Sequence, residues 1–387
     1  MTETRPKPLV RILGRSLLCR HINNLHVDEI VVVVNYLKDL VIDELRNCTI
    51  KSILKIINQE KELGTGHAIL KAIYNSNGDI FYIIHGDLFL PKKFYKIIEN
   101  SKPNTIFGFK VQDPRWYGLL KVRNNILEDI IEKPVGYKGE GLVYTGISVL
   151  DRNIVKYLEV LKPSPRGELE FTDALAAMAR STDVGVRELP VWIDVGKPWD
   201  LLRAVRTAME LELEPGIYGD VASTAVIEGP VYIAPGAVVG HHTVVEGPAW
   251  IGPGARIGPN AHVRPYTQLD EVSFVGFSSQ VKGSILMEGA KAPHLNYVGD
   301  SIVGEYVNLG AGTITANLRF DDKTVRVRVK NEVVDSGMRK LGAFIGGYAK
   351  TGINVSIMPG VKIGSRAVVY PGCRVDHDVP SGKVFKC

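Results

Sequence analysis

Aliphatic residues recur at every sixth position between residues 227 and 281. The series is Ile227, Ile233, Val239, Val245, Ile251, Ile257, Val263, Leu269, Val275 and Val281. Gly, Pro, Ala and Asn are frequent between them, as in IAPGAVVG and IGPGARIG. A six-residue period is typical of a parallel β-helix, in which each hexapeptide supplies one short strand and one turn. The period is lost after Lys282 and returns from Ile345 to Val375.

Three such hexapeptides would close one coil, with the aliphatic residues pointing inward and the coils stacked at roughly 4.8 Å. One coil cannot bury its own apolar residues, so the stack must be several coils tall. An ordinary β-sandwich is the alternative, but its strands alternate at period two and its turns recur less evenly. The pattern therefore predicts a parallel β-helix over residues 222–387.

Residues 1–204 follow a different pattern and predict a separate α/β domain. Apolar runs at residues 30–34 and 80–84 end in polar turns, and helical patterns lie between them at residues 36–45 and 68–74. Apolar runs alternating with helices indicate a mostly parallel sheet, which binds ligands at the carboxyl ends of its strands. A helical pattern at residues 201–213 precedes Pro215 and Gly216. We therefore assign residues 205–221 as a linker helix.

Composition narrows the possible functions. A net charge of +5 suits small anionic substrates but is too weak to indicate nucleic-acid binding. No apolar run is long enough to cross a bilayer, and the N-terminus has no apolar signal segment, so we expect a cytoplasmic protein with no membrane partner. Cys19, Cys48, Cys373 and Cys387 form no CxxC pair, which argues against a zinc site or a disulfide framework.

A set of short motifs lies along the first domain. They are TETRPKPL (2–9), QEKELGTGHA (59–68), HGD (85–87), YG (117–118), EKP (132–134), TG (145–146), RGELEFTD (166–173) and WIDVG (192–196). Singly they are weak signals, because an Asp after a strand is commonly a turn residue and GTG commonly precedes a helix. Together, in this order, they resemble the sugar-1-phosphate nucleotidylyltransferases, and the resemblance covers nearly all of residues 1–210.

This resemblance implies a Rossmann-like α/β fold and a reaction of a nucleoside triphosphate with a sugar 1-phosphate, assisted by Mg²⁺. Both reactants are anionic, so positioning and charge neutralisation supply most of the catalysis. The resemblance assigns Lys7 to phosphate, Gln59, Gly64 and Thr65 to the nucleotide base, Asp87 and Asp194 to Mg²⁺, and Gly118, Glu132, Lys133 and Gly146 to the sugar phosphate. The alternative for Glu132 and Lys133 is an exposed charged turn.

One family feature is absent from the 387 residues. The family has a strand and a glycine-rich loop, of the form LAAGxGTRLxP, ahead of TETRPKPL, whereas this sequence begins at Met1. The loop would wrap the triphosphate with backbone N–H groups. Without the strand, its neighbours in the sheet would face an unpaired gap. Either the start is set too late or nucleotidyl transfer has been lost. For the chain as written we expect weak or absent nucleotidyl transfer.

The interruption of the six-residue period is the second region of interest, because insertions in a solenoid cluster on one face and often carry function. A first interruption covers residues 289–300, and a second covers residues 316–341. A lone histidine in a loop is usually only solvated. His294, however, is close in sequence to Tyr297, with Lys282 and Arg264 on nearby coils.

Four stretches carry a second resemblance: RPYTQL, KGSILMEGAKAPHLNYVGD, VNLGAGTITANLRFDDK and LGAFIGGYAKTGINVSIMPGVKIG. They are similar to the acetyltransferase half of the bifunctional uridylyltransferase/glucosamine-1-phosphate acetyltransferases, particularly the archaeal relatives. The similarity covers residues 222–387 almost without gaps. It implies a left-handed parallel β-helix, acetyl-CoA as co-substrate, and a homotrimer with active sites at the subunit interfaces.

In this reaction an amine attacks the acetyl-CoA thioester and must lose a proton, which suits a histidine base. The resemblance makes His294 that base and assigns the sugar phosphate to Arg264, Lys282, Lys291 and Tyr297. It places Asn308 and Asn317 at the sugar, Lys323 in reach from a neighbouring subunit, and residues 346–371 along the CoA groove. The alternative for Asn308 is an internal asparagine ladder.

The expected acceptors are glucosamine 1-phosphate and galactosamine 1-phosphate, and the expected nucleotides are UTP or dTTP, giving UDP-GlcNAc or related products. Two other readings stay open. One is a non-catalytic assembly subunit similar to the translation-factor exchange subunits, and the other uses the first domain as an inert nucleotide-sugar sensor. The first is disfavoured by His294 and its basic neighbours, since a scaffold has no need of a base in a cationic pocket.

Overall fold

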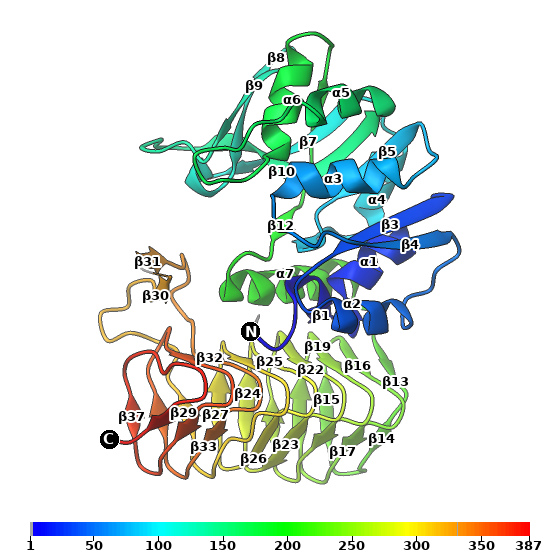
Figure 1. Cartoon of the computed structure of the whole chain (residues 1–387). Helices are drawn as coiled ribbons and strands as arrows, with labels where there is room; N and C mark the ends of the chain where they lie inside the picture. Colours follow the sequence, from blue (N-terminus) through cyan, green and yellow to red (C-terminus); the bar gives the residue numbers. More distant parts are fainter. Residues whose placement is uncertain (1–2, 331) are drawn as a thin grey trace. The chain divides into compact units, whose positions relative to one another are not determined.

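The computed structural model describes residues 3–330 and 332–387, which form two compact units (Figure 1). The α/β unit consists of Pro6–Val10 and Ser16–Asp194. The solenoid unit consists of Val195–Cys387 together with the described part of Met1–Arg5 and Arg11–Arg15. The domain boundaries expected from the sequence stay a prediction.

The α/β unit alternates short helices with strands. Its helices are α1 (Leu17–Asn24), α2 (Lys38–Leu45), α3 (Thr65–Tyr74), α4 (Tyr95–Glu99), α5 (Val155–Leu158) and α6 (Phe171–Ala179), with 3₁₀ turns η1 (Lys7–Leu9), η2 (Lys92–Phe94), η3 (Pro114–Trp116) and η4 (Arg152–Ile154). Its strands are β3 (Glu29–Val34), β4 (Ile53–Asn58), β5 (Ile80–Ile84), β6 (Leu88–Phe89), β7 (Thr105–Val111), β8 (Gly118–Arg123), β9 (Ile126–Glu132), β10 (Gly141–Asp151), β11 (Gly185–Glu188) and β12 (Ile193–Asp194).

The main sheet of this unit is mixed, with the strand order β5-β10-β7-β11-β9-β8. Within it β7 and β11 run parallel, whereas β10 runs antiparallel to both β5 and β7, and β8 and β9 form an antiparallel hairpin. The predicted mostly parallel sheet is therefore wrong. A strand buried on both faces has the same continuous apolar composition in either direction, so the apolar runs could not reveal that β10 turns back between its neighbours.

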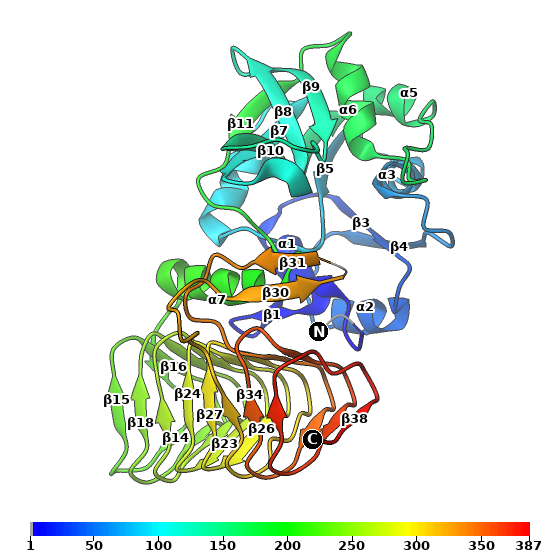
Figure 2. The same ribbon diagram turned by 90° about the vertical axis from the view of Figure 1, so that its left-hand side faces the viewer.

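The strands of the α/β unit do not form one continuous sheet. Among the described residues β3 pairs only with β4, in a separate parallel two-stranded sheet, and β5 pairs only with β10 at the edge of the main sheet. Figure 2 shows β3 and β4 as a ribbon pair distinct from β5. The backbone groups along one side of β3 and one side of β5 consequently have no strand partner.

The predicted β-helix is confirmed, and it has three faces. The first face contains β13 (Gly216–Ile217), β16 (Val231–Ile233), β19 (Ala249–Ile251), β22 (Thr267–Leu269), β25 (Ile285–Leu286), β28 (Ile302–Val303), β32 (Phe344–Ile345) and β35 (Lys362–Ile363). The second contains β14 (Asp220–Val221), β17 (Val238–Val239), β20 (Arg256–Ile257), β23 (Phe274–Phe277) and β26 (Lys291–His294), then β33 (Lys350–Thr351), β36 (Val368–Val369) and β38 (Val384–Phe385). The third contains β15 (Val226–Glu228), β18 (Val244–Glu246), β21 (His262–Val263), β24 (Gln280–Lys282), β27 (Tyr297–Gly299), β29 (Ile314–Thr315), β34 (Ser356–Ile357) and β37 (Arg374–Val375).

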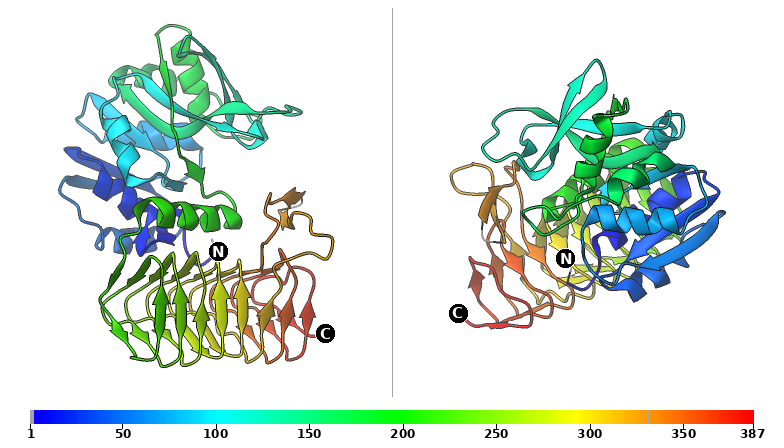
Figure 3. Two further views of the ribbon diagram at one scale, coloured as in Figure 1. Left: turned by 180° about the vertical axis from the view of Figure 1, so that it is seen from behind. Right: turned by 45° about the horizontal axis from the view of Figure 1, so that its top comes forward.

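Each coil places one apolar side chain per face in the interior. On the third face Val263 pairs with Val281 and Val281 with Val298, and all three are fully buried. The second step is one residue shorter than the first, and the shortening lies between Val281 and Leu286, so residues 289–300 continue the coils and do not form a loop, contrary to the expected interruption. The left view of Figure 3 shows the successive coils stacked side by side.

Residues 316–341 do leave the stack, as predicted for the second interruption. They form an arm that carries the antiparallel hairpin of β30 (Arg326–Val329) and β31 (Glu332–Asp335) (Figure 2). Val325 and Val327 are buried, whereas the Phe320 side chain is fully exposed. The solenoid ladder resumes beyond the arm, since Thr315 pairs with Ile357.

A helix and an N-terminal segment cover the solenoid. The helical pattern at residues 201–213 is present as α7 (Pro198–Glu212), whereas the later part of the assigned linker contains β13 and β14. The Arg206 guanidinium lies 4.0 Å from the centroid of the Tyr266 ring. In the N-terminal segment Arg5 pairs with Glu288 at 3.2 Å, and β1 (Arg11–Ile12) pairs with β2 (Arg15–Ser16). None of the described helices is both long and apolar enough to span a membrane.

The cysteines form two disulfides, Cys19–Cys48 and Cys373–Cys387. The expectation of no disulfide framework is therefore wrong. The partners are 29 and 14 residues apart in sequence, and the fold brings them together where α2 returns beside α1 and where β38 lies along β36. Cysteine spacing alone does not report such proximity, because it contains no information on where the chain turns back.

Candidate active sites

Asp87 and Asp194 lie side by side in the α/β unit. Strands β6 and β12 pair so that Leu88, directly after Asp87, faces Asp194. The Lys7 ammonium lies 3.5 Å from a carboxylate oxygen of Asp87. Mg²⁺ is often held by one or two carboxylates with waters and substrate phosphates completing its shell, so this donor pair fits the ion. No group of three or more His, Cys, Asp or Glu side chains suited to a metal occurs among residues 3–330 and 332–387.

Gly146 permits a close approach of His85 to β10. The register of β10 shifts between Tyr144 and Ser148, and Gly146 has φ +78° within this irregularity. A Cβ atom at Gly146 would lie 2.6 Å from His85 Nδ1. Burial lowers the pKa of His85, and the nearby charge of Asp87 opposes this shift. A larger residue at position 146 would displace the ring next to the candidate Mg²⁺ site.

The residues assigned to the nucleotide base share one loop. Gln59 follows β4, and its Nε2 donates to the Gly64 carbonyl at 3.0 Å. Gly64 has φ +100° and immediately precedes α3, whose first residue is Thr65; the Thr65 hydroxyl accepts from the Phe171 N–H at 3.2 Å. Leu169 N–H also donates to the Leu63 carbonyl at 2.7 Å. The nucleotide loop is thus hydrogen-bonded to the RGELEFTD motif.

Glu132 is held by residues of that same motif. It faces Gly118 across the β8–β9 hairpin, and its two carboxylate oxygens contact Arg166 at 3.2 Å and the Thr172 hydroxyl at 3.1 Å. Burial raises the pKa of Glu132. Lys133 is more exposed, with its ammonium 3.9 Å from Glu132. Arg166 and Thr172 were given no role from the sequence, although their motif had been singled out.

In the solenoid unit, residues at one corner of successive coils meet around Asp300. Arg264, Lys282 and Asp300 lie at this corner in three consecutive coils; the Arg264 N–H donates to the Val281 carbonyl and the Asp300 N–H to the Lys282 carbonyl, both at 2.8 Å. The Lys282 ammonium lies 2.9 and 3.0 Å from the two Asp300 oxygens. Asn317 Nδ2 donates to Asp300 at 2.5 Å and to the Tyr297 hydroxyl at 3.2 Å. Three predicted site residues, Lys282, Tyr297 and Asn317, are therefore in one hydrogen-bonded network.

Arg264 is held from the coil below. Its Nε lies 3.8 Å from a Glu246 oxygen, and the other Glu246 oxygen lies 3.2 Å from His262 Nε2. The cationic corner is thus partly balanced by two carboxylates, Glu246 and Asp300. Neither was identified from the sequence. The signal was present, because Glu246, Arg264, Lys282 and Asp300 follow one another at intervals of 18 residues, the length of three hexapeptides.

His294 lies at the next corner, at the end of β26, and its side chain is exposed. Its backbone N–H donates to Asn296 Oδ1 at 3.0 Å, and the buried Asn296 Nδ2 donates to the Gly310 carbonyl at 2.8 Å. Lys291 begins the same strand and bridges to Asn308. Asn308 is exposed, so the internal-ladder alternative for it is wrong. The corner is shaped by Asn296, which the sequence interpretation did not single out.

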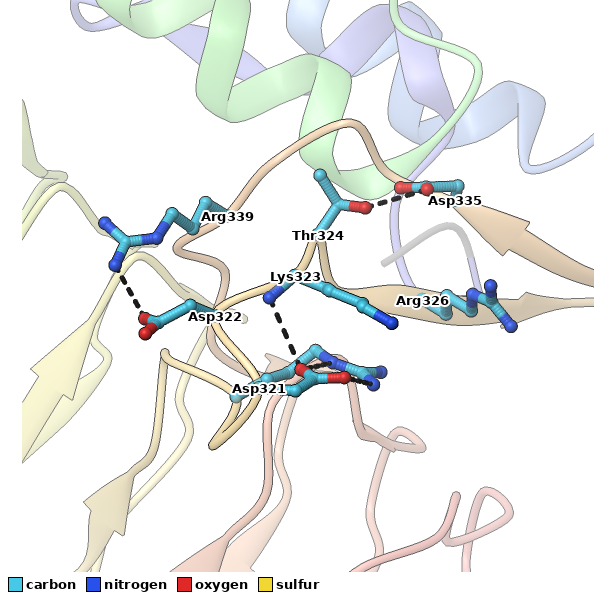
Figure 4. A pocket seen from close by; sticks show the side chains of 8 residues that line it. Asp321, Asp322, Lys323, Thr324, Arg326, Asp335 and Arg339 are labelled. Atoms are coloured by element: carbon cyan, nitrogen blue, oxygen red, sulfur yellow. Dashed lines mark hydrogen bonds and ion pairs between the residues drawn. The ribbon is translucent and has the colours of Figure 1, made fainter.

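Lys323 lies on the arm, in the pocket drawn in Figure 4. The pocket is lined by Arg319, Asp321, Asp322, Lys323, Thr324, Arg326, Asp335 and Arg339. Arg319 pairs with Asp321 at 2.7 Å and lowers the pKa of that carboxyl, and Arg339 pairs with Asp322 at 2.6 Å. Within the described chain the Lys323 ammonium has no carboxylate partner, and its hydrogen bond is made by its backbone to Asp321. The single chain does not join Lys323 to His294.

Comparison with known proteins identifies the family. The family model described as "Nucleotidyl transferase" matches residues 1–210. A "Bifunctional sugar-1-phosphate nucleotidylyltransferase/acetyltransferase" of Sulfurisphaera tokodaii is 45% identical over 395 residues, covering 100% of this chain and 96% of the relative. The chain belongs to this bifunctional family. The "Bifunctional protein GlmU" of Methanococcus aeolicus and that of Methanocaldococcus jannaschii are 43% and 42% identical, each covering 98% of this chain and 92% of the relative.

The protein is accordingly a bifunctional nucleotidylyltransferase/acetyltransferase. The predicted resemblance is confirmed for both halves of the chain, and the non-catalytic subunit is not supported. In the bifunctional enzyme each compact unit contains all the residues assigned to one reaction. Those of nucleotidyl transfer lie in the α/β unit, from Lys7 to Asp194, and those of acetyl transfer lie in the solenoid unit, from Arg264 to Lys323.

Proposed function

We propose that the solenoid unit transfers the acetyl group of acetyl-CoA to the amino group of glucosamine 1-phosphate, with galactosamine 1-phosphate as a second acceptor. The observation that carries this proposal is the cationic corner of Arg264 and Lys282. It is separated from the exposed His294 by about the length of one short strand, β27. Such a strand spans roughly 10 Å at about 3.3 Å per residue, a separation that suits a sugar phosphate.

In the proposed reaction His294 accepts a proton from the sugar ammonium, and the resulting amine attacks the thioester carbonyl carbon. The carbon–sulfur bond then breaks, the attacking nitrogen gives its second proton to the CoA thiolate, which leaves as a thiol, and His294 releases its proton to solvent. A backbone N–H of a neighbouring coil would donate to the oxyanion. The phosphate would accept from Arg264 as a fork and from Lys282 and Lys291 as point charges. Tyr297, Asn308 and Asn317 would hold the sugar.

The direct test replaces His294 by alanine. We expect H294A to lower kcat of acetyl transfer by about 10²–10⁴-fold, the usual contribution of a general base, while leaving the fold unchanged. Thiol release from acetyl-CoA with glucosamine 1-phosphate measures the rate. His241→Ala is a matched control, since His241 is an exposed solenoid histidine whose side chain is hydrogen-bonded only to Thr224 in the described chain. Activity of H294A within threefold of the parent would remove His294 from the mechanism.

For the α/β unit we infer Mg²⁺-dependent transfer of a nucleotidyl group from UTP or dTTP to a sugar 1-phosphate. Asp87 and Asp194 would hold Mg²⁺, which when bound neutralises the phosphates. Lys7 would neutralise phosphate charge, Gln59 to Thr65 would enclose the base, and Gly118, Glu132, Lys133 and Gly146 would line the sugar phosphate site. Pyrophosphate release from UTP and N-acetylglucosamine 1-phosphate measures this activity.

We further propose that three copies assemble, with Lys323 reaching a neighbouring site and residues 346–371 lining the CoA groove. An exposed apolar edge supports this proposal. Phe277 and Leu295 lie at the same corner as His294 on two successive coils, where the Leu295 N–H donates to the Phe277 carbonyl at 3.0 Å, and Ile353 lies at this corner two coils further along; the three residues are 48%, 60% and 55% exposed. Burial of such an edge against a second copy would remove apolar surface from water. The cytoplasmic location stays a prediction.

A further inference from the structure

Asp300 is the shared partner of two residues assigned to the sugar phosphate site. Its carboxylate is 13% exposed and accepts from Lys282 and from Asn317 through the contacts described above. Asp300 has φ +46°, a left-handed conformation that aspartate tolerates better than most residues. Its N–H donates to Lys282 and its carbonyl accepts from Gly342, both at 2.8 Å. Backbone and side chain are therefore both fixed by neighbouring coils.

The carboxylate determines which way the Asn317 amide faces. An ionised carboxylate can only accept hydrogen bonds, so the atom of Asn317 that faces it must be the amide nitrogen. That nitrogen has two hydrogens, and its two partners are Asp300 and the Tyr297 hydroxyl. No described residue donates to the side-chain oxygen of Asn317. This oxygen is thus held as an available acceptor next to the cationic corner.

Gly299 provides the space for this arrangement. A Cβ atom at Gly299 would lie 2.7 Å from both Asn317 Nδ2 and the Tyr297 hydroxyl, nearer than real Cβ contacts allow. Gly299 lies in β27, between Tyr297 and Asp300, and its position pairs with Lys282 on the coil below. The network of four side chains therefore depends on the absence of a side chain at Gly299 as well as on the Asp300 carboxylate.

We propose that Asp300 is a positioning residue that selects the amino sugar, and this proposal rests on the proposed acetyl transfer. By fixing the orientation of the Asn317 amide, Asp300 presents the side-chain oxygen of Asn317 to the substrate. This acceptor favours the sugar ammonium, which can only donate, over a hydroxyl, which can also accept. By holding the Lys282 ammonium in place it fixes the phosphate at a constant distance from that acceptor. The ligand class that the corner recognises is a sugar phosphate that bears a primary amine.

The test is Asp300→Asn in the full chain, which preserves the shape of the side chain but lets position 300 present either an oxygen or a nitrogen to Asn317. We expect kcat/KM for glucosamine 1-phosphate to fall by about tenfold to a hundredfold, as for other misplaced binding groups, with the KM for acetyl-CoA unchanged. Inhibition by glucose 1-phosphate, which has a hydroxyl in place of the amine, should weaken by a smaller factor, because this sugar loses only the contribution of Lys282 to phosphate binding. A weakening of both sugars to the same extent would overturn the selection of the amine.

A second variant separates Asn317 from Lys282. Gly299→Ala displaces Asn317 and Tyr297 but leaves the Lys282–Asp300 pair, and we expect it to lose discrimination between amine and hydroxyl as Asp300→Asn does. If Gly299→Ala behaves like the parent, Asp300 acts through Lys282 alone and the proposal fails. Asp376→Asn is the charge control, because Asp376 pairs with Arg374 and His377 on the last coil. A parent without acetyl transfer would instead contradict the proposed function.

Discussion

At the residue scale, the buried pair Gln268 and Asp270 shows how one side chain can satisfy a backbone far away in sequence. Gln268 is fully buried, and its amide accepts from the Leu13 N–H at 2.9 Å and donates to the Arg11 carbonyl at 3.0 Å. It also donates to Asp270 at 2.9 Å. Asp270 is 2% exposed, and burial raises its pKa to about 7 despite the nearby positive charges of Arg11 and Arg5.

This raised pKa predicts a pH dependence of stability. Between the ordinary aspartate pKa and about pH 7 the folded protein holds a proton on Asp270 that the unfolded chain has released. Stability from this group is therefore full at low pH and is lost as pH rises toward 7, at up to about 1.4 kcal/mol for each pKa unit. Asp270→Asn should flatten this decline between pH 4 and 7, as measured by urea unfolding. A parallel slope in the variant would show that Asp270 does not titrate there.

At the element scale, the length of each coil decides which side chains face one another. The coil from Val281 to Val298 is one residue shorter than the coil before it, and residues 316–341 extend out of the stack as the arm. The ladder nevertheless continues from Thr315 to Ile357. The last strand, β38, pairs with β36 over only two positions, and the Cys373–Cys387 disulfide secures it.

Removal of that disulfide should loosen the C-terminal end of the solenoid. Because the bridge closes a segment of 14 residues, Cys373→Ser should cost up to about 3 kcal/mol of unfolding free energy for the solenoid unit. The thermal midpoint and the rate of proteolysis at the C-terminus would measure the loss. Cys19→Ser, which opens the other disulfide, is the matched control and should leave C-terminal proteolysis unchanged. Equal proteolysis rates in the parent and Cys373→Ser would contradict the prediction.

At the scale of the whole molecule, the two reactions are divided between two units that each contain their own candidate residues. Assembly is expected to concern the solenoid, where His294 shares a corner with the exposed Phe277, Leu295 and Ile353. Lys323 has no carboxylate partner within the described chain, and it needs a second copy if it is to act at the site.

An aspartate at this edge should prevent assembly. Leu295→Asp places a charge on a surface that would otherwise be buried between copies, so we expect the mass measured by light scattering to fall from that of a trimer toward the 42.6 kDa chain. Acetyl transfer should fall in parallel. Ile217→Asp, at an exposed position of the first coil, is the control and should keep the parent mass. A trimer that persists in Leu295→Asp would exclude this edge from the interface.

The sequence by itself determined the coil and much of the candidate chemistry. A six-residue period is a local property, repeated at every inward position from Ile227 onward, and no distant contact is needed to recognise it. The motifs placed Asp87 and Asp194 at strands, and β6 and β12 do pair there. The helix α7 could also be predicted, because its pattern ends at a Pro-Gly breaker.

Only the tertiary structure decided which distant residues meet. Where the chain turns back decides the direction of β10, the two disulfides and the hydrogen bonds from Arg166 and Thr172 to Glu132. Composition and spacing contain no information on these turns. The contact of Asp300 with Asn317 likewise depends on a shortened coil followed by the start of the arm. A repeat fixes the inward side chains, since each follows from its own hexapeptide. Which outward-facing side chains contact one another depends on the number of residues in each coil that lies between them.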